Sequence, residues 1–412
     1  MDRIKKYSNN LTLIVSEGGA FSSSFGIMIG TGSVNENEDN NGISHYIEHM
    51  NFKGTKNYTA FDISNLMEMT GANFNAYTSN ETTCFYAQTI SEHLEKTFSV
   101  MSQAVFASIY LDSEAEKEKQ VIIEEINMSE DTPDEVCFDL IAKAFYGEDG
   151  YGRTILGSSK NVSSFTKQNI LDYLDDFYVA ENTVITFAGK VTFEEAEKLV
   201  EKYVMPYIKC NKKGEIPSHN TINKKQHLSK IKDIEQAHFC MSFQSVPYVS
   251  ENRIASEMAV GILGGGMSSR LFTKIREELG LAYSVYSYAS RMKDVGTVNI
   301  YAGVNSDKVD DAFNGILETL EKFKKDGITD EEFTKIKNQL KSSTVFSMER
   351  PSSKVQLFSK YYLMMGKLYD FNERLNMVDK VKKEDVEKMA YEFDVKNMSS
   401  AIVGRKVKPF KI

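Results

Sequence analysis

The predicted helices and strands of this 412-residue chain occur twice in the same order, and this repetition constrains the fold more than any other feature. In the first half, two β-prone runs precede two helices with apolar residues at helical spacing, two further β-prone runs and long charged helices. In the second half, one β-prone run precedes the same series. The first set falls at 11–15, 25–29, 43–52, 62–70, 73–79, 82–88, 91–147, 164–178 and 183–188, and the second at 238–243, 254–262, 270–278, 282–288, 297–304, 307–324 and 330–346. The sequence therefore predicts an α+β fold of two structurally duplicated halves, each a mostly antiparallel sheet packed with helices.

Length, charge and turn residues place the boundary between the halves near the middle of the chain. At about 150 residues per domain, 412 residues require at least two domains. Residues 213–225 are polar and interrupted by Gly214 and Pro217, which is typical of a linker. Residues 1–212 carry 17 Lys and Arg against 32 Asp and Glu, and 213–412 carry 32 against 26, so the net charges are −15 and +6. We therefore expect domains at 1–212 and 226–412, joined by a linker at 213–225.

Composition excludes several classes of protein. A hydrophobic fraction of 41% and a charged fraction of 26% are those of an ordinary globular chain. No apolar run approaches the roughly 18 residues of a membrane-spanning helix, and the N-terminus lacks a signal peptide, so we expect a cytoplasmic protein without a membrane partner. The net charge of −9 argues against nucleic acid as a partner. Four dispersed cysteines argue against a disulfide framework or a cysteine-bound zinc.

Two of the six histidines lie in the sequence His45-Tyr46-Ile47-Glu48-His49. Residues four apart stack on one face of a helix, so His45 and His49 can present imidazole nitrogens to one ion, with Glu48 on the same side. Imidazole pairs suit zinc. The alternative is an ordinary histidine pair with Glu48 in a helix ion pair, but the ordered spacing favours a zinc site.

A zinc site of this kind needs a base and a third protein ligand. Zinc held by three protein groups lowers the pKa of a bound water to about 7, and Glu48 is placed to take its proton and pass it to a leaving amine. Residues 114–128 predict an acidic helix, in which Glu118 and Glu125, seven apart, share one face, while Glu124 points about 100° away from Glu125. From the residues alone, Glu118 and Glu125 are both candidates for the third ligand, and their spacing does not decide between them. The alternative is that they belong to a solvated acidic face.

The motif and several other segments carry a resemblance to a known family. His45 to Met50, followed by Phe52-Lys53-Gly54-Thr55, resembles the inverted zinc-binding motif of the pitrilysin, insulysin and mitochondrial processing peptidase family. The segments 71–79, 151–157, 182–189, 263–272 and 276–286 also resemble that family, so the likeness spans essentially the whole chain. It implies one zinc ion per chain, with Glu125, 76 residues after His49, as third ligand. A further family glutamate that supports the site corresponds to Glu118.

The resemblance also implies where a peptide substrate would be held. Asn75, Ala76, Tyr77 and Thr78 match the family's edge strand, to which an extended substrate adds as one more strand. Arg276 and Tyr283 match the family's arginine and tyrosine that reach the active site from the second half. From the residues alone, 75–78 could equally be a paired interior strand. For the other two, the residues alone favour an ion pair of Arg276 with neighbouring acids on a helix surface and a core position for Tyr283 in a strand.

The second half carries no such histidine motif, so one half is expected to be catalytic and the other inactive. The resemblance, to the short bacterial type, implies a clamshell in which the halves enclose small peptides or unfolded segments. We therefore expect a zinc-dependent metalloendopeptidase with Glu48, Arg276 and Tyr283 as catalytic residues, working as a homodimer. The alternative is a non-catalytic peptide-binding or structural subunit of the same fold. Hydrolysis of a substrate other than a peptide is a further alternative that the spacing leaves open.

Overall fold

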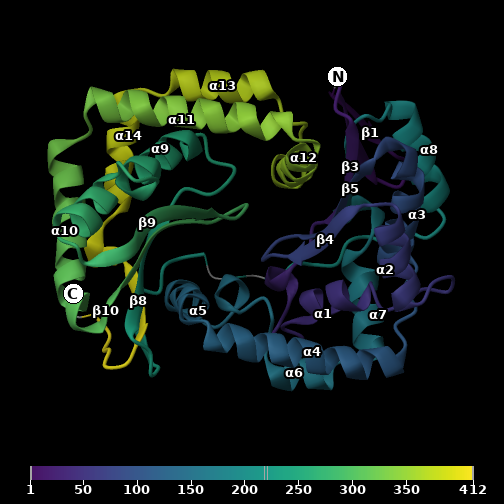
Figure 1. Ribbon diagram of the computed structural model, residues 1–412, viewed down its shortest axis with the longest axis horizontal. Helices are drawn as coiled ribbons and strands as arrows, with labels where there is room; N and C mark the ends of the chain where they lie inside the picture. Colours follow the sequence, from purple (N-terminus) through teal and green to yellow (C-terminus); the bar gives the residue numbers. More distant parts are fainter. Residues whose placement is uncertain (1, 218, 220, 411–412) are drawn as a thin grey trace. The chain divides into compact units, whose positions relative to one another are not determined.

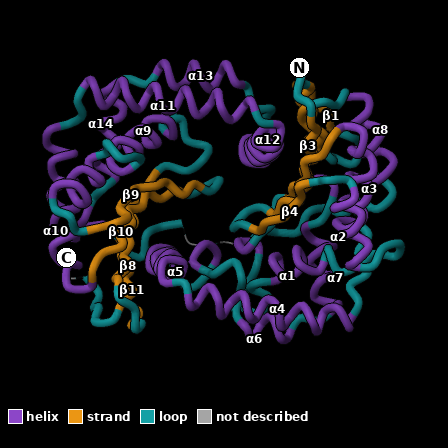
Figure 2. Tube along the Cα trace, viewed as in Figure 1, coloured by secondary structure: helices purple, strands orange, loops and turns teal. Residues whose placement is uncertain are grey.

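The computed structural model describes residues 2–217, 219 and 221–410 and contains two sheets, shown in orange in Figure 2. The six-stranded sheet has the order β1-β2-β6-β3-β5-β4, and the five-stranded sheet the order β7-β11-β8-β10-β9. The first sheet comprises β1 (Asp2–Lys6), β2 (Thr12–Glu17), β3 (Ser22–Ile29), β4 (Asn73–Thr78), β5 (Thr83–Ile90) and β6 (Thr183–Gly189). The second comprises β7 (His227–Ile231), β8 (Gln236–Ser245), β9 (Ala282–Arg291), β10 (Gly296–Asn305) and β11 (Ser399–Gly404).

The two sheets have the same topology. In each, one pair is parallel, β2 with β6 and β7 with β11, and the remaining pairs are antiparallel. The order β2-β6-β3-β5-β4 then corresponds strand for strand to β7-β11-β8-β10-β9. The α+β class and the duplication expected from the repeated element order are therefore confirmed.

The chain divides into two compact units, each built around one sheet (Figure 1). Unit 1 consists of Met1–Ile126, Thr154–Ser218 and Phe346–Tyr369, and unit 2 of Asn127–Arg153, His219–Val345 and Asp370–Ile412. The helices of unit 1 are α1 (Ile43–Met50), α2 (Ala60–Met69), α3 (Leu94–Phe106), most of α4 (Asp112–Asp131), α6 (Ser159–Ser164), α7 (Lys167–Phe177), α8 (Phe193–Tyr203) and α12 (Pro351–Met365). Those of unit 2 are α5 (Pro133–Tyr146), α9 (Arg253–Gly264), the π-helical η5 (Phe272–Glu278), α10 (Val309–Asp326), most of α11 (Asp330–Glu349), α13 (Phe371–Lys380) and α14 (Lys383–Met389).

Each sheet is covered by helices on both faces. Alternate residues of a strand point to opposite faces, and Phe25, Ile27, Ile185 and Phe187 belong to the main core of unit 1. The intervening residues face α12: Thr186 Oγ1 lies 2.7 Å from Ser359 Oγ, and Gly26 lies directly under Val355. A strand covered on both faces loses the usual alternation of apolar and polar residues, as the fully buried β6 does.

Helix α5 has the same place in unit 2 that α12 has in unit 1. Phe239 and Ile300 face the main core of unit 2, whereas Cys240, Ala401 and Val403 form a smaller cluster with residues of α5. Ser399 Oγ donates a hydrogen bond to Ala144 O, 2.9 Å away, and so fixes α5 to β11. The sheet of each unit is thus closed by a helix from the opposite half of the sequence.

This exchange distinguishes the compact units from the expected domains at 1–212 and 226–412. Both exchanged helices follow a 20-residue helix and begin with a proline, Pro133 in α5 and Pro351 in α12. Proline ends one helix and suits the first position of the next, so it marks each redirection of the chain. The expected linker at 213–225 includes residues 218 and 220, which lie outside the described residues. The division between units at 218–219 falls within it.

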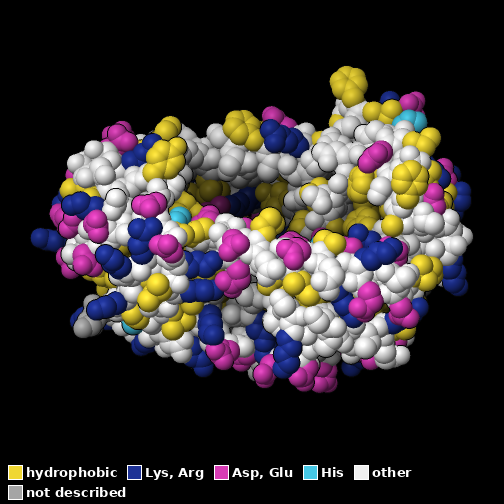
Figure 3. All heavy atoms as spheres, turned by 60° about the horizontal axis from the view of Figure 1, so that its bottom comes forward, with side chains coloured by type: hydrophobic (Ala, Val, Ile, Leu, Met, Phe, Trp, Pro, Cys, Tyr) yellow, Lys and Arg dark blue, Asp and Glu magenta, His cyan; other side chains and the backbone are white. Residues whose placement is uncertain are grey.

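Side chains of Lys and Arg are interspersed with those of Asp and Glu over the face drawn in Figure 3. Many form short-range pairs, such as Lys117 with Glu114 at 2.7 Å and Lys322 with Glu318 at 2.8 Å. Such exposed pairs contribute about 0–1 kcal/mol each, so the stability of the units depends mainly on their apolar cores.

The contact between α12 and β3 can be tested by a double-mutant cycle. A Cβ at Gly26 would lie 2.5 Å from Val355 Cγ1, so Gly26→Ala should lower the free energy of unfolding by about 1–3 kcal/mol through overpacking. Val355→Ala should cost about 2 kcal/mol through lost burial. Because the shorter side chain makes room for the new methyl group, the double variant should lose less than the sum, as measured by urea unfolding of the full chain. Strict additivity would contradict this packing.

Candidate metal centre

Helix α1 presents the histidine motif on one side and packs into the core on the other. Ile43, Tyr46, Ile47 and Met50 are fully buried at the i, i+3, i+4, i+7 spacing of a core-facing stripe. His45 and His49 lie together, with ring centroids 4.6 Å apart. The apolar stripe therefore determines which way the two imidazoles point.

The loop before α1 contains a carboxylate that fixes the start of this helix. Gly42, the residue before the first turn, has φ 99° and carries no side chain to cap it. The wholly buried Glu36 takes that role: Oε2 accepts a hydrogen bond from Gly42 N at 2.7 Å, and Oε1 accepts one from Ser44 N at 2.9 Å. Sequence reasoning did not identify Glu36, because it lies six residues before the N-cap Gly42, outside the usual capping positions.

His45, His49 and Glu125 of α4 each contribute one ligand atom to a cluster within 4.8 Å. Glu125 Oε2 lies 3.7 Å from His45 Nε2 and 3.5 Å from His49 Nε2. Ligands bound to one tetrahedral zinc at about 2.0–2.1 Å are separated by about 3.3 Å. Two imidazole nitrogens and one carboxylate oxygen match the donors of catalytic zinc sites, so these residues fit zinc.

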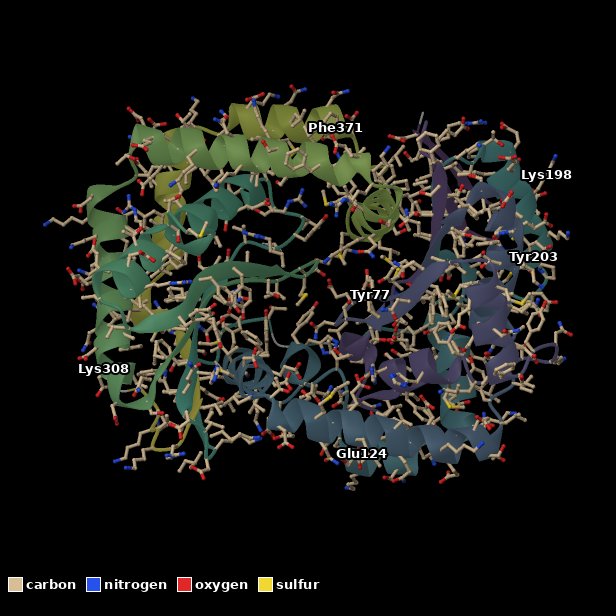
Figure 4. The ribbon with its side chains drawn as sticks, in the orientation of Figure 1. Tyr77, Glu124, Lys198, Tyr203, Lys308 and Phe371 are labelled. Carbon is tan, nitrogen blue, oxygen red and sulfur yellow. The ribbon has the colours of Figure 1, made fainter. Side chains whose placement is uncertain are left out.

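Glu118 lies behind His49 on the same face of α4 as Glu125. Its Oε1 is 2.8 Å from His49 Nδ1, and its Oε2 is 2.7 Å from Lys53 Nζ. If His49 Nδ1–H donates to Glu118, the lone pair of Nε2 is directed toward Glu125 and the metal position. Glu124, labelled on α4 in Figure 4, is exposed. The structure thus brings Glu118 and Glu125 to one site and leaves Glu124 outside it.

Glu48 is held by a residue of β4. Thr78 Oγ1 donates a hydrogen bond to Glu48 Oε2 at 2.6 Å. Burial raises the pKa of Glu48, and the negative charge of Glu125 adds to this, against the opposing effects of Thr78 and His49. The carboxylate therefore has its pKa displaced toward the range that suits a proton carrier at ordinary pH. The contact between Thr78 and Glu48 could not be read from the sequence.

The two histidines differ in basicity. Burial and the neighbouring His49 lower the pKa of His45 to about 3. Burial also opposes the protonation of His49, but the hydrogen bond to Glu118 and the charges of the surrounding carboxylates outweigh it and raise the pKa of His49. Conversely, His49 and Lys53 outweigh the effect of burial on Glu118 and lower its pKa. Glu118 therefore remains a carboxylate.

Strand β4 forms an edge of its sheet in the described part of the chain, so an interior position for residues 75–78 is wrong. It pairs with β5, Asn75 opposite Tyr86 and Ala76 opposite Phe85. Ala76 N–H donates to the side chain of Asn75 at 2.9 Å. Tyr77, labelled in Figure 4, packs near Tyr86 with ring centroids 6.2 Å apart.

Arg276 and Tyr283 belong to unit 2 and lie beside each other. Arg276 Nη1 donates to Tyr283 O at 3.1 Å, and its guanidinium lies 4.9 Å from the centroid of the Tyr283 ring. Tyr283 is 76% exposed, so a core position for this aromatic is wrong. Both side chains are therefore accessible in unit 2, that of Arg276 in part.

Comparison with known proteins decides the family. The family model described as "Insulinase (Peptidase family M16)" matches residues 12–159, and that described as "Peptidase M16 inactive domain" matches 164–340. A protein of Bacillus subtilis named "Uncharacterized zinc protease YmxG" is 36% identical over 406 residues, which cover 97% of this chain and 98% of that protein. The chain belongs to peptidase family M16.

Other M16 relatives extend this result. An "Uncharacterized zinc protease" of Rickettsia felis is 33% identical over 403 residues, which cover 97% of each chain. The crystal structure of a protease from Helicobacter pylori matches with a TM-score of 0.91 at 22% identity, covering 98% of this chain and 99% of that one. A structure described as the peptidase M16 inactive domain from Pseudomonas fluorescens matches with a TM-score of 0.91 at 17% identity, covering all of both chains. These structures show the shared fold.

Zinc affinity should depend on pH through His49 rather than His45. Because its pKa is raised, His49 takes up a proton at Nε2 as the pH falls toward mildly acid values, and that proton competes with zinc. His45, with a pKa of about 3, stays neutral there. Calorimetry in buffers of different ionisation enthalpy, near pH 6 and so below the pKa of about 7 for zinc-bound water, should detect release of about one proton per zinc.

The control for this experiment is Glu118→Gln. It removes the hydrogen bond that raises the pKa of His49, so the loss of zinc affinity should move to lower pH. An affinity that does not change with pH in the unmodified protein would contradict the assignment.

Proposed function

We propose that this chain is a zinc-dependent endopeptidase that hydrolyses small peptides or unfolded segments. The observation that carries the proposal is the cluster of His45, His49 and Glu125, with Glu48 of the same helix beside it. The relatives named zinc proteases support the metal and the reaction class.

Glu48 acts as the proton carrier of the proposed reaction. His45, His49 and Glu125 would hold the zinc, which when bound would supply Lewis-acid chemistry for the activation of water and the polarisation of the peptide carbonyl. The Glu48 carboxylate takes a proton from the attacking water and transfers it to the leaving amine. Thr78 holds Oε2 of Glu48, which orients the other carboxylate oxygen. The raised pKa of Glu48 makes its carboxylate a stronger base for the first of these two proton transfers.

The free edge of β4 supports the proposed mode of substrate binding. An extended peptide can pair with residues 75–78 through main-chain hydrogen bonds, which accept many sequences because they do not involve side chains. Pairing at Ala76 would displace the Asn75 side chain, which at present accepts from Ala76 N–H. The strand that would align the peptide also carries Thr78, so binding and the placement of Glu48 share one element.

Arg276 and Tyr283 complete the proposed site. Their exposed guanidinium and phenol are donors suited to a substrate carbonyl and to the negative charge that develops on it. This role, and enclosure of the peptide in a chamber between the halves, follow from the family resemblance. A homodimer and a cytoplasmic location also stay predictions; light scattering of the purified protein tests the former. None of the helices in the described residues is long and apolar enough to span a membrane.

The variant Glu48→Gln tests the reaction. We expect it to bind zinc like the unmodified protein but to lose at least about 100-fold in kcat/KM toward a quenched peptide library, since the amide cannot take up the proton. Glu124→Gln, which changes an exposed residue of α4, is the matched control and should cleave normally. If Glu48→Gln cleaves as fast as the unmodified protein, the mechanism is wrong. If the unmodified protein binds zinc and cleaves no peptide, the non-catalytic alternative is favoured.

The variants Arg276→Lys and Tyr283→Phe test the contribution of unit 2. Arg276→Lys replaces the guanidinium fork by a single ammonium group, and Tyr283→Phe removes the phenol hydroxyl. Because a donor is misplaced or lost in each, kcat/KM should fall by about 10²-fold while zinc content stays unchanged. Tyr391→Phe, at another exposed tyrosine of unit 2, is the control. Cleavage at the unmodified rate by both variants would exclude them from the site.

A further inference from the structure

Lys53 contacts the metal centre from the turn that follows α1. Its backbone N–H donates to Met50 O at 3.1 Å, which closes the turn, and its Nζ lies 2.7 Å from Glu118 Oε2. The side chain is 30% exposed, whereas that of Glu118 is 5% exposed. Lys53 thus links the end of the histidine helix to the acidic helix α4.

The contact engages Glu118 at both oxygens. Oε1 faces His49 Nδ1 at 2.8 Å, and Oε2 faces Lys53 Nζ. A carboxylate held at both oxygens cannot rotate freely, so the geometry of the hydrogen bond to His49 is fixed by the ammonium group on the far side. Glu118 reaches the metal position only if it breaks this pair.

Restraint of Glu118 matters because Glu125 is its neighbour on the same helix face. Both are glutamates, seven residues apart on α4, and both adjoin His49. Either carboxylate is a chemically suitable zinc ligand. The difference between them is that Glu118 is paired with Lys53.

The arrangement of charged side chains gives a second argument. The carboxyl groups of Glu48, Glu118 and Glu125 adjoin the two imidazoles in a half-buried region. Lys53 pairs with the oxygen of Glu118 that does not face His49, so this carboxylate has a cationic partner without a bond to the metal. Burial of an uncompensated charge is costly, so the pair with Lys53 favours the position of Glu118 behind His49.

We propose that Lys53 is a positioning residue of the metal centre: it holds Glu118 behind His49, where Glu118 orients the imidazole, and so leaves Glu125 as the third ligand. The inference rests on the proposed function only in taking zinc as the bound metal. It adds a residue 65 positions away from Glu118 in the sequence, which acts on zinc through that carboxylate.

The test compares Lys53→Met, Lys53→Arg and the matched control Lys119→Met in the full chain. Lys119 forms an equally short pair with Glu116 on α4, 2.7 Å, and does not contact Glu118. Lys53→Met should weaken zinc binding by about 10-fold, the lower end of the range for groups that support metal ligands, measured by competition with a chelator. Its Co²⁺ derivative should show a changed visible spectrum as Glu118 becomes free to coordinate. Lys53→Arg should restore both properties, and Lys119→Met should resemble the unmodified protein.

A Glu118→Gln background separates positioning from a general effect on folding. There, Lys53→Met should have no further effect on zinc affinity, because Lys53 acts through the carboxylate. Unchanged zinc affinity and Co²⁺ spectrum in Lys53→Met, an equal loss in Lys119→Met, or a full additional loss in the Glu118→Gln background would each overturn the proposal. These readouts need no peptidase activity, so a protein that binds zinc but does not cleave peptides would refute the proposed function and leave this inference tested on its own.

Discussion

The metal centre depends on the fixed position of one short helix. Helix α1 has eight residues, too few to be stable by itself, and it starts at a glycine that offers no side-chain cap. The buried carboxylate of Glu36 satisfies its first amide groups, and the negative charge interacts favourably with the positive end of the helix dipole. Burial of a carboxylate is costly without such hydrogen bonds, so helix and carboxylate require each other. His45 directly follows Ser44, whose backbone N–H donates to Glu36.

In unit 2, the helix that corresponds to α1 carries different side chains from the histidine motif. Helix α9 follows β8 as α1 follows β3, and it carries Glu257 in place of the histidine motif. Glu257 Oε2 pairs with Arg374 Nη2 at 2.8 Å, so an ion pair neutralises a charge on the helix that corresponds to the one carrying His45 and His49 in unit 1. The match of residues 164–340 to the inactive M16 domain agrees with this difference. The duplicated halves share a scaffold, and within the described residues the cluster of His45, His49 and Glu125 belongs to unit 1.

Features set by local geometry could be predicted from the sequence, and features set by distant packing could not. The placement of His45 and His49 on one helix face follows from their spacing, as does the shared face of Glu118 and Glu125. The choice of Glu125 as a ligand came from the family resemblance. Strands β1, β7 and β11 went unpredicted. The exchange of α5 and α12 also went unpredicted, because no local pattern shows which sheet a helix will cover. The contact of Thr78 with Glu48 likewise joins residues 30 positions apart, and a sequence gives no sign of it.

The exchange of α5 and α12 bears on how the protein is made. The N-terminal part of a chain emerges from the ribosome first, and most domains fold once their own residues have emerged. Unit 1 cannot do so, because one face of its sheet is covered by α12, at Pro351–Met365, which is synthesised after the strands of both sheets except β11. Unit 2 in turn receives α5 early, long before its own strands exist. Completion of the unit that carries the histidine motif is therefore coupled to synthesis of the chain through Met365, and a chain that stopped before α12 would carry that motif on an unfinished scaffold.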